Sequence, residues 1–416
     1  MLSKSTSIIR YWYWVWLISA MFVGVMVMFF LTRYPAWLHY SYRGLSLSHE
    51  MSYGVWWSAI CLFLAAIVFA NVGAAVERGS SKPWPWYLLA VGMLALAFDE
   101  VGSLHETVAR VAGWQGLVPF GLVLGIGFGA ALIELLRNPA SRMAATLVIF
   151  GLGIFATVVG LEMLEHDYSF QHPFWRRARQ VGEEASELVA MGLLITAGLV
   201  AMKRMGDPDR RVINATAIVQ RLADYPLAVF ILFILHSGLT VAVILPNYTF
   251  FPEGNPSALF PMLMFFCLGI MAAINVQKGE SRWFWRILAI LFIAASMSQL
   301  YNGYVLIENV FNPDPLHSPY FVNLFGFEVR VGRILAEPPV SWCLTLLPFL
   351  YLGIRKYREG KVEASSIWQP LMLLALLYLL VFPDLDLRFR LEYLYFLFSG
   401  AVAWSCYRLM VESEIS

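Results

Sequence analysis

Charged residues are scarce in this chain. Asp, Glu, Lys and Arg together make up 14% of its 416 residues, whereas soluble domains carry about 25%. This shortage excludes an ordinary soluble domain. A net charge of +1 supplies no basic surface of the kind that binds nucleic acid, so no nucleic-acid partner is expected. The chain has only four cysteines, all inside apolar runs, and they indicate no disulfide framework.

Long apolar runs occupy the sequence instead, and 59% of all residues are hydrophobic. A helix that crosses ~30 Å of hydrocarbon needs about 20 such residues. We therefore expect an all-α polytopic integral membrane protein with about twelve transmembrane helices. Lys4 and Arg10 precede the first run and no small-residue cleavage site follows it, so we interpret that run as an uncleaved span. The runs begin near residues 14, 54, 84, 117, 143, 184, 226, 257, 285, 339, 366 and 391.

The basic residues fall in alternate loops between these runs. The positive-inside rule assigns those loops, and with them both termini, to the cytoplasm. Short loops and the uncleaved first span favour the cytoplasmic (inner) membrane of a bacterium. The exception is an Arg trio in the external loop between the fifth and sixth runs. The basic residues on the inner side are Lys4, Arg10, Arg78, Lys82, Arg137, Arg142, Lys203, Arg204, Arg210, Arg211, Lys278, Arg282, Arg286, Arg355, Lys356, Arg358, Lys361 and Arg408.

An internal repeat is visible at an offset of 199 residues. The segment Trp-Pro-Trp-Tyr-Leu-Leu-Ala from Trp84 matches Trp-Phe-Trp-Arg-Ile-Leu-Ala from Trp283. Because each half has about six runs and both halves start on the cytoplasmic side, the pattern predicts a parallel 6+6 duplication. We expect a first repeat at 1–205, a cytoplasmic linker at 206–225 and a second repeat at 226–416.

Acids and histidines gather at the outer ends of three runs of the first repeat only. At the same offset Asp99 becomes Ser298, Glu100 becomes Gln299 and His105 becomes Tyr304. The second copy thus keeps the apolar scaffold without the charges, which indicates that the charges serve function rather than folding. Ionisable groups at the edge of hydrocarbon are costly and usually mark a site. The segments are Asp99–Glu106, Glu162–Asp167 and Glu183–Glu187.

Helical spacing predicts that these side chains share faces. Glu162 and His166 are four residues apart, as are Glu183 and Glu187, and such pairs face the same way. Carboxylate and imidazole groups on converging helices are how bundles hold metals. We therefore expect a divalent metal (Zn, Mn or Fe). The alternatives are solvated helix caps with salt bridges, or a proton-coupling site. The predicted ligands are Asp99, His105, Glu106, Glu162, His166, Glu183 and Glu187.

Two further roles follow from the metal hypothesis. A carboxylate that is not bound to the metal, Glu106 or Glu184, would act as catalytic general base. The external arginines could recognise a phosphate of a lipid headgroup or polyprenyl carrier, or they could snorkel and form salt bridges to the acids. The predicted substrate-binding residues are Arg176, Arg177, Arg179 and Glu50.

The motif Asp99-Glu100 with Ser103-x-His105-Glu106, the early Glu50 and the later Glu183-Glu184-x-x-Glu187 resembles a set of uncharacterised bacterial polytopic membrane proteins. That resemblance covers mainly the first half and implies no known activity. The stretch around Asp99 is also similar to alkaline ceramidase-like membrane hydrolases, in which Asp, Ser and several His build a zinc site. The paired His of a last helix in those enzymes has no counterpart here.

The sequence thus predicts a metal-dependent membrane enzyme of hydrolase or transferase type that acts on a lipid or lipid-linked substrate at the outer face. The first alternative is a proton- or cation-coupled secondary transporter, because a parallel 6+6 plan is known among transporters. The second alternative is a non-catalytic membrane assembly protein.

Overall fold

The computed structural model divides the chain into two compact units, Met1–Asn214 and Ala215–Ser416. The residues that it describes are 6–32, 53–76, 82–102, 105, 114–163, 173–205, 259–276, 282–299, 321–324, 327–330, 339–360, 399–400, 402–407 and 409–410.

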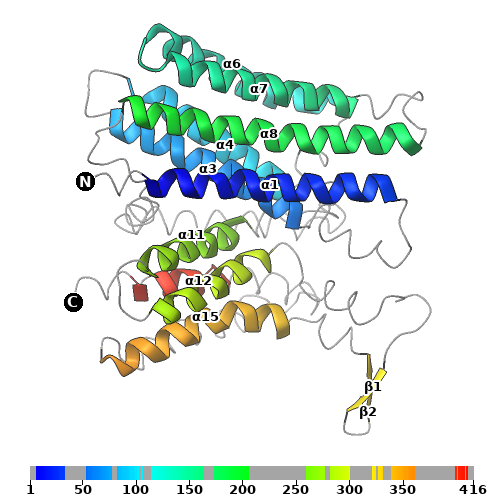
Figure 1. Ribbon diagram of the computed structural model, residues 1–416, viewed down its shortest axis with the longest axis vertical. Coiled ribbons are helices and arrows are strands. Elements are labelled where there is room, and N and C mark those ends of the chain that lie inside the picture. The colour runs from blue at the N-terminus through cyan, green and yellow to red at the C-terminus, as the bar shows by residue number, and fades with distance from the viewer. Residues whose placement is uncertain are drawn as a thin grey trace. The chain divides into compact units, whose positions relative to one another are not determined.

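The described part of the first unit is helical throughout (Figure 1). Prolines stand in the first turn of three of its helices, where a missing N–H costs nothing and the fixed φ favours helix entry. These are Pro85, Pro119 and Pro173. The helices are α1 (Thr6–Thr32), α3 (Tyr53–Val76), α4 (Trp84–Gly102), α6 (Val118–Arg137), α7 (Arg142–Met163) and α8 (Pro173–Met205), with a short 3₁₀ turn η1 (Trp114–Leu117).

Helix α3 forms the core of this unit and α6 lies at its edge. Two thirds (67%) of the apolar stretch of α3 is buried, against 11% for that of α6. Helix α3 packs against α4, α8 and α1, whereas α6 packs against α4 and α7. A span so little covered by protein is suited to contact with lipid.

Helices α3 and α4 run antiparallel. Gly73, near the end of α3, lies against the ring of Tyr87 at the start of α4, at 3.0 Å from a Cβ built on the glycine. The rings of Phe69 and Trp86 are 6.0 Å apart in the same region. The last turn of α4, which carries Asp99, therefore lies at the end of the unit where α3 begins.

Helix α1 shows how α3 and α8 are aligned. Its Trp16 ring would lie 2.4 Å from a Cβ on Gly192 of α8. One turn further along α1, the buried Ser19 hydroxyl accepts a hydrogen bond from the Trp57 indole of α3 at 2.9 Å. Position 57 of α3 therefore lies about level with position 192 of α8.

A second contact gives the direction. Val68 of α3 would lie 2.3 Å from a Cβ on Gly198 of α8. Residue numbers rise together along both helices, so α3 and α8 run parallel. The start of α8, with Glu183, and the end of α4, with Asp99, hence lie at the same end of the first unit. The opposite end carries basic residues: Lys82 and Arg137 contact Glu134 at 2.9 and 3.6 Å.

The second unit packs three described helices in chain order. Helix α12 (Arg282–Met297) contacts both α11 (Leu259–Asn275) and α15 (Pro339–Arg358). Strands β1 (Phe321–Leu324) and β2 (Phe327–Arg330) form an antiparallel hairpin in which Phe321 pairs with Arg330. Helical residues also occur at 399–400, 402–407 and 409–410.

These elements confirm a largely helical protein that contains candidate membrane-spanning helices. Four described helices are long and apolar enough to cross a membrane: 54–76, 84–102, 115–137 and 178–205. Shorter apolar helices cover 15–27, 142–158 and 260–273. The hairpin was not predicted. The predicted runs near 226 and 366 lie outside the described residues, so the count of twelve stays a prediction.

Candidate functional site

Asp99 and His105 form the first polar contact of the candidate site. Asp99 lies in the last turn of α4, which ends at Gly102, and His105 follows three residues later. The Oδ1 atom of Asp99 accepts the backbone N–H of His105 at 2.8 Å. Its Oδ2 atom lies 2.9 Å from Nδ1 of the imidazole. Both side chains are half-buried, with 16% of Asp99 and 31% of His105 exposed. The carboxylate therefore holds the imidazole ring next to the last turn of α4.

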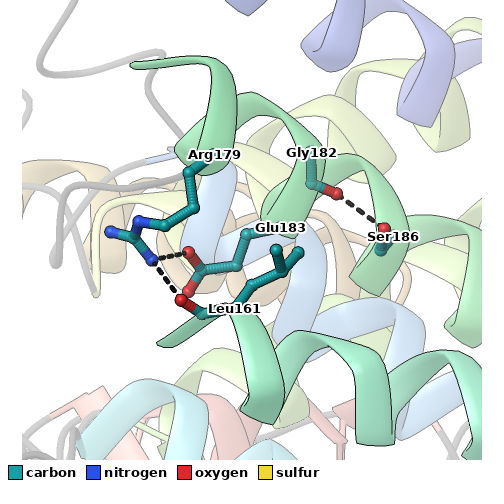
Figure 2. A network of polar contacts seen from close by, with 5 residues as sticks. All are labelled: Leu161, Arg179, Gly182, Glu183 and Ser186. Carbon is teal, nitrogen blue, oxygen red and sulfur yellow. Dashed lines mark hydrogen bonds and ion pairs between the residues drawn. The ribbon is translucent and has the colours of Figure 1, made fainter. Parts of the chain in front are cut away.

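Arg179 and Glu183 form the second contact, one turn apart on α8. The Nη1 atom of Arg179 lies 2.5 Å from Oε2 of Glu183 and donates a second hydrogen bond to the backbone oxygen of Leu161 at 3.3 Å (Figure 2). Only 3% of the arginine side chain and 15% of the glutamate side chain are exposed. The pair therefore joins the start of α8 to the end of α7 in a mostly buried place.

The other acids of α8 lie on the same turns. Glu184 and Glu187 are half-buried, and each takes part in a polar interaction. The Ser186 hydroxyl donates its hydrogen bond to the backbone oxygen of Gly182 at 2.6 Å, within α8 (Figure 2).

Both contacts lie at one end of the first unit, because the end of α4 and the start of α8 meet the same end of α3. The described helices therefore carry Asp99, His105 and Glu183 to the same end of the first unit. The positive-inside rule predicts that this is the outer end.

Several predicted site residues have no described side chain. Glu162 belongs to the last turn of α7, next to Leu161, and Arg176 and Arg177 belong to the first turns of α8. The predicted residues that lie outside the described part of the chain are Glu50, Glu106 and His166.

The seven predicted ligands do not come together within the described residues. In that part of the chain no three His, Cys, Asp or Glu side chains are grouped closely enough to hold a metal. What the structure brings together is a carboxylate–imidazole pair on α4 and a guanidinium–carboxylate pair on α8. The complete ligand set, which includes Glu106 and His166, stays a prediction.

Arg179 is the residue whose setting differs most from a substrate-binding arginine. Its side chain is buried and its contacts include Glu183 and the end of α7, which agrees with the salt-bridge alternative for the external arginines. The spacing of Arg179 and Glu183 at i and i+4 was the signal in the sequence. The bond to a backbone oxygen of another helix had no signal there.

The described residues thus form a helical protein with four candidate membrane-spanning helices, and its first unit carries a carboxylate–imidazole pair and a guanidinium–carboxylate pair at one end. A family model described as a domain of unknown function (DUF8692) matches residues 17–202, slightly less than half of the chain. The match covers the part that carries both polar contacts. Neither the curated proteins nor the solved structures include a match.

Proposed function

We propose that this protein is a metal-dependent membrane enzyme, of hydrolase or transferase type, that acts on a lipid or lipid-linked substrate at the outer face of the membrane. The contact between Asp99 and His105 carries the proposal. A histidine held through one ring nitrogen by a carboxylate is the usual arrangement both for a metal ligand and for a general base.

The roles within the site follow from that contact. Asp99 fixes the orientation of the ring and favours the tautomer with the proton on Nδ1, so that Nε2 is the atom that binds a metal or accepts a proton. A bound divalent ion would polarise a carbonyl or phosphoryl oxygen and acidify a water. Glu184 or Glu106 would take the proton of that water. The ligands beyond His105 would come from the carboxylates of α7 and α8 and from His166.

The outer end of the unit suits a lipid substrate. Helix α4 is 19 residues long, or about 28 Å at 1.5 Å per residue, so its last turn lies near the boundary between hydrocarbon and headgroups. An ester, amide or phosphate of a membrane lipid lies at the same depth. A soluble substrate would not require the site to be there.

We also infer that the chain holds twelve spans arranged as a parallel 6+6 duplication. Three residues buried on α4, Pro85, Leu89 and Met93, correspond at the offset of 199 to three buried on α12, Phe284, Leu288 and Phe292. The packing order supports the same inference, because α3, α4 and α6 contact one another in sequence, as do α11, α12 and α15.

The two copies differ where the chemistry would lie. Ser298 and Gln299 stand at the positions of Asp99 and Glu100, and both are buried. Gln299 donates to the backbone oxygen of Ala295 at 3.0 Å and lies 3.4 Å from the Thr345 hydroxyl. The neutral side chains at these positions form hydrogen bonds within the second unit. This contrast supports a functional role for the charges of the first copy.

The metal content of the purified full-length protein tests the proposal. We expect near-stoichiometric Zn, Mn or Fe by elemental mass spectrometry, and its loss in a His105→Gln/Glu187→Gln variant. Ser298→Ala/Gln299→Leu, at the neutral place in the second unit, is the matched control and should keep the metal. A protein without metal after chelator-free handling would refute the metalloenzyme and favour proton-coupled transport, which uptake by proteoliposomes under a pH gradient would detect.

A further inference from the structure

Helices α12 and α15 of the second unit pack against each other and run antiparallel (Figure 1). The ring of Phe284, at the start of α12, stacks on Tyr351 in the second half of α15, with 4.9 Å between the ring centroids. Gln299, just after α12, lies 3.4 Å from the Thr345 hydroxyl in the first half of α15. The start of α12 therefore lies beside the end of α15.

Four arginines gather where these two helix ends meet. Two belong to the first turns of α12 and two to the last turn of α15. Arg355 is paired with Glu359 at 2.7 Å. The other three are exposed and form no salt bridge with any described residue, so the described part of the unit leaves their charge uncancelled. The four are Arg282, Arg286, Arg355 and Arg358.

Aromatic rings orient two of these arginines. The guanidinium carbon of Arg286 lies 5.2 Å from the centroid of the Trp283 ring, and that of Arg355 lies 4.0 Å from the centroid of Phe284. Trp283 is 73% exposed, so its contact with Arg286 lies at the surface. A guanidinium stacked on a ring keeps the N–H groups at its edge, and these can donate two parallel hydrogen bonds to a phosphate. Arg286 is therefore oriented before a ligand arrives.

Exposed apolar side chains continue from the arginines along both helices. Ile290 of α12 is 68% exposed, and Ile354 of α15 is 50% exposed. Ile290 lies four residues after Arg286, and Arg358 lies four residues after Ile354, so each isoleucine shares a helix face with an arginine. A molecule with a phosphate at one end and acyl chains at the other matches this order of charge and apolar surface.

We infer that the start of α12 and the end of α15 form a binding site for the phosphate group of an anionic membrane lipid in the inner leaflet. Arg282 and Arg286 bind the phosphate oxygens, the Trp283 ring holds Arg286 in place, and Arg358 adds positive charge. The acyl chains lie along the exposed apolar faces of the two helices.

Charge complementarity identifies this occupant. The positive-inside rule predicts that this end of the second unit faces the cytoplasm. The cytoplasmic leaflet carries anionic lipids, and basic pockets beside membrane helices on that side bind their headgroups. The inference concerns the second unit and does not depend on the metal site proposed for the first.

Native mass spectrometry of the full-length protein in detergent, with added dioleoyl phosphatidylglycerol, tests this inference. Phosphatidylcholine with the same chains measures binding to a lipid without net charge. Arg282→Gln/Arg286→Gln removes two charges of the site, and Trp283→Leu removes the ring under Arg286 without a change in charge. Lys203→Gln/Arg204→Gln is the matched control, because it removes two exposed basic residues from the last turn of α8 in the first unit.

We expect Arg282→Gln/Arg286→Gln to weaken phosphatidylglycerol binding at the tightest site about 10- to 30-fold, since each basic residue near an anionic lipid contributes about fivefold. Trp283→Leu should weaken it about two- to fivefold through the lost cation–π contact. The control should leave this binding unchanged, and phosphatidylcholine should bind less tightly than phosphatidylglycerol to the wild type.

Three results would overturn the inference. Equal weakening by the control would mean a general attraction of anionic lipid to basic residues rather than a site. Equal affinity for the two lipids would remove the role of charge. Displacement of the lipid by excess inorganic phosphate would assign the arginines to a soluble anion. If the double variant does not fold, Arg286→Gln and Trp283→Leu singly give the same comparison.

Discussion

Asp99 contacts His105 through both of its carboxylate oxygens, one on the backbone N–H at 2.8 Å and one on the ring Nδ1 at 2.9 Å. The first bond orders the chain after α4, and the second orients the imidazole. The two effects can be separated, because an amide in place of the carboxylate can still accept the backbone hydrogen bond.

Asp99→Asn is therefore expected to preserve the fold and impair the chemistry. The amide nitrogen would donate to Nδ1 and reverse the tautomer of His105, which removes Nε2 as base or ligand. We expect a change of about 1 kcal/mol in unfolding free energy, a loss of about 10²- to 10⁴-fold in turnover and a loss of about 10- to 100-fold in metal affinity. Thermal unfolding and metal analysis of the same preparation would measure the first and the last. Full metal occupancy in Asp99→Asn would contradict the role given to the pair.

The neutral residues of the second unit supply a ready substitution for the first. Asp99→Ser/Glu100→Gln copies the pair Ser298 and Gln299, which the α12 scaffold already accommodates. We expect the variant to fold, with an unfolding midpoint within a few degrees of the wild type, and to lose the metal. Circular dichroism during heating checks the fold.

The reverse substitution should be far worse. Ser298 is 3% exposed, and a carboxylate buried there without a cation costs several kcal/mol. Ser298→Asp is thus expected to lower yield and the unfolding midpoint strongly. Equal tolerance of the two substitutions would contradict the division between a charged functional copy and a neutral structural one.

Close packing between α4 and α6 depends on one glycine. A Cβ at Gly92 would lie 2.2 Å from Cε1 of the buried Phe128. Gly92→Ala should therefore destabilise the protein by about 1–3 kcal/mol through overpacking. Gly125→Ala on α6 is the control, since nothing lies within 4 Å of its added Cβ, and it should be neutral or stabilise the protein by up to about 1 kcal/mol, because alanine has the higher helix propensity. Thermal unfolding in one detergent compares the two, and an equal effect would contradict the packing.

The hydrogen bond between Trp57 and Ser19 should show coupling in a double-mutant cycle. Ser19→Ala leaves a buried indole N–H without its acceptor, which costs about 1–3 kcal/mol. Adding Trp57→Phe removes that N–H as well, so the double variant should be less destabilised than the sum of the two single variants by about 0.5–1.5 kcal/mol. Strict additivity would mean that the bond contributes nothing.

The apolar runs predicted a helix start well where the helix begins at the point at which the sequence changes from polar to apolar. The runs expected near 84 and 143 correspond to α4, which begins at Trp84, and α7, which begins at Arg142. Helix α8 begins at Pro173, about three turns before the expected start near 184. Its first turns contain arginines and glutamates, so hydropathy could not detect them, although their backbone continues the same helix.

The site was predictable in its residue types and less so in its contacts. The pairing of Arg179 with Glu183 follows from i,i+4 spacing. Asp99 and His105 are six residues apart, and an ideal helix would put them on different faces. Their contact instead depends on the path of the chain after Gly102. The burial of Arg179 depends on where the last turn of α7 lies, which no local pattern encodes. Alternating residues around Phe-Gly at 325–326 were the overlooked signal for the hairpin.

The length of α8 has a consequence for the lipid around the protein. Its 33 residues extend about 50 Å at 1.5 Å per residue, against ~30 Å of hydrocarbon. In a helix that crosses the bilayer with Lys203 and Arg204 at its inner end, the turns that carry Arg179 and Glu183 would lie where the medium changes from acyl chains to headgroups. A thicker bilayer would draw this ion pair into lower dielectric and strengthen it, and a thinner one would hydrate and weaken it. Bilayer thickness would thus set how firmly α7 and α8 are joined at that end.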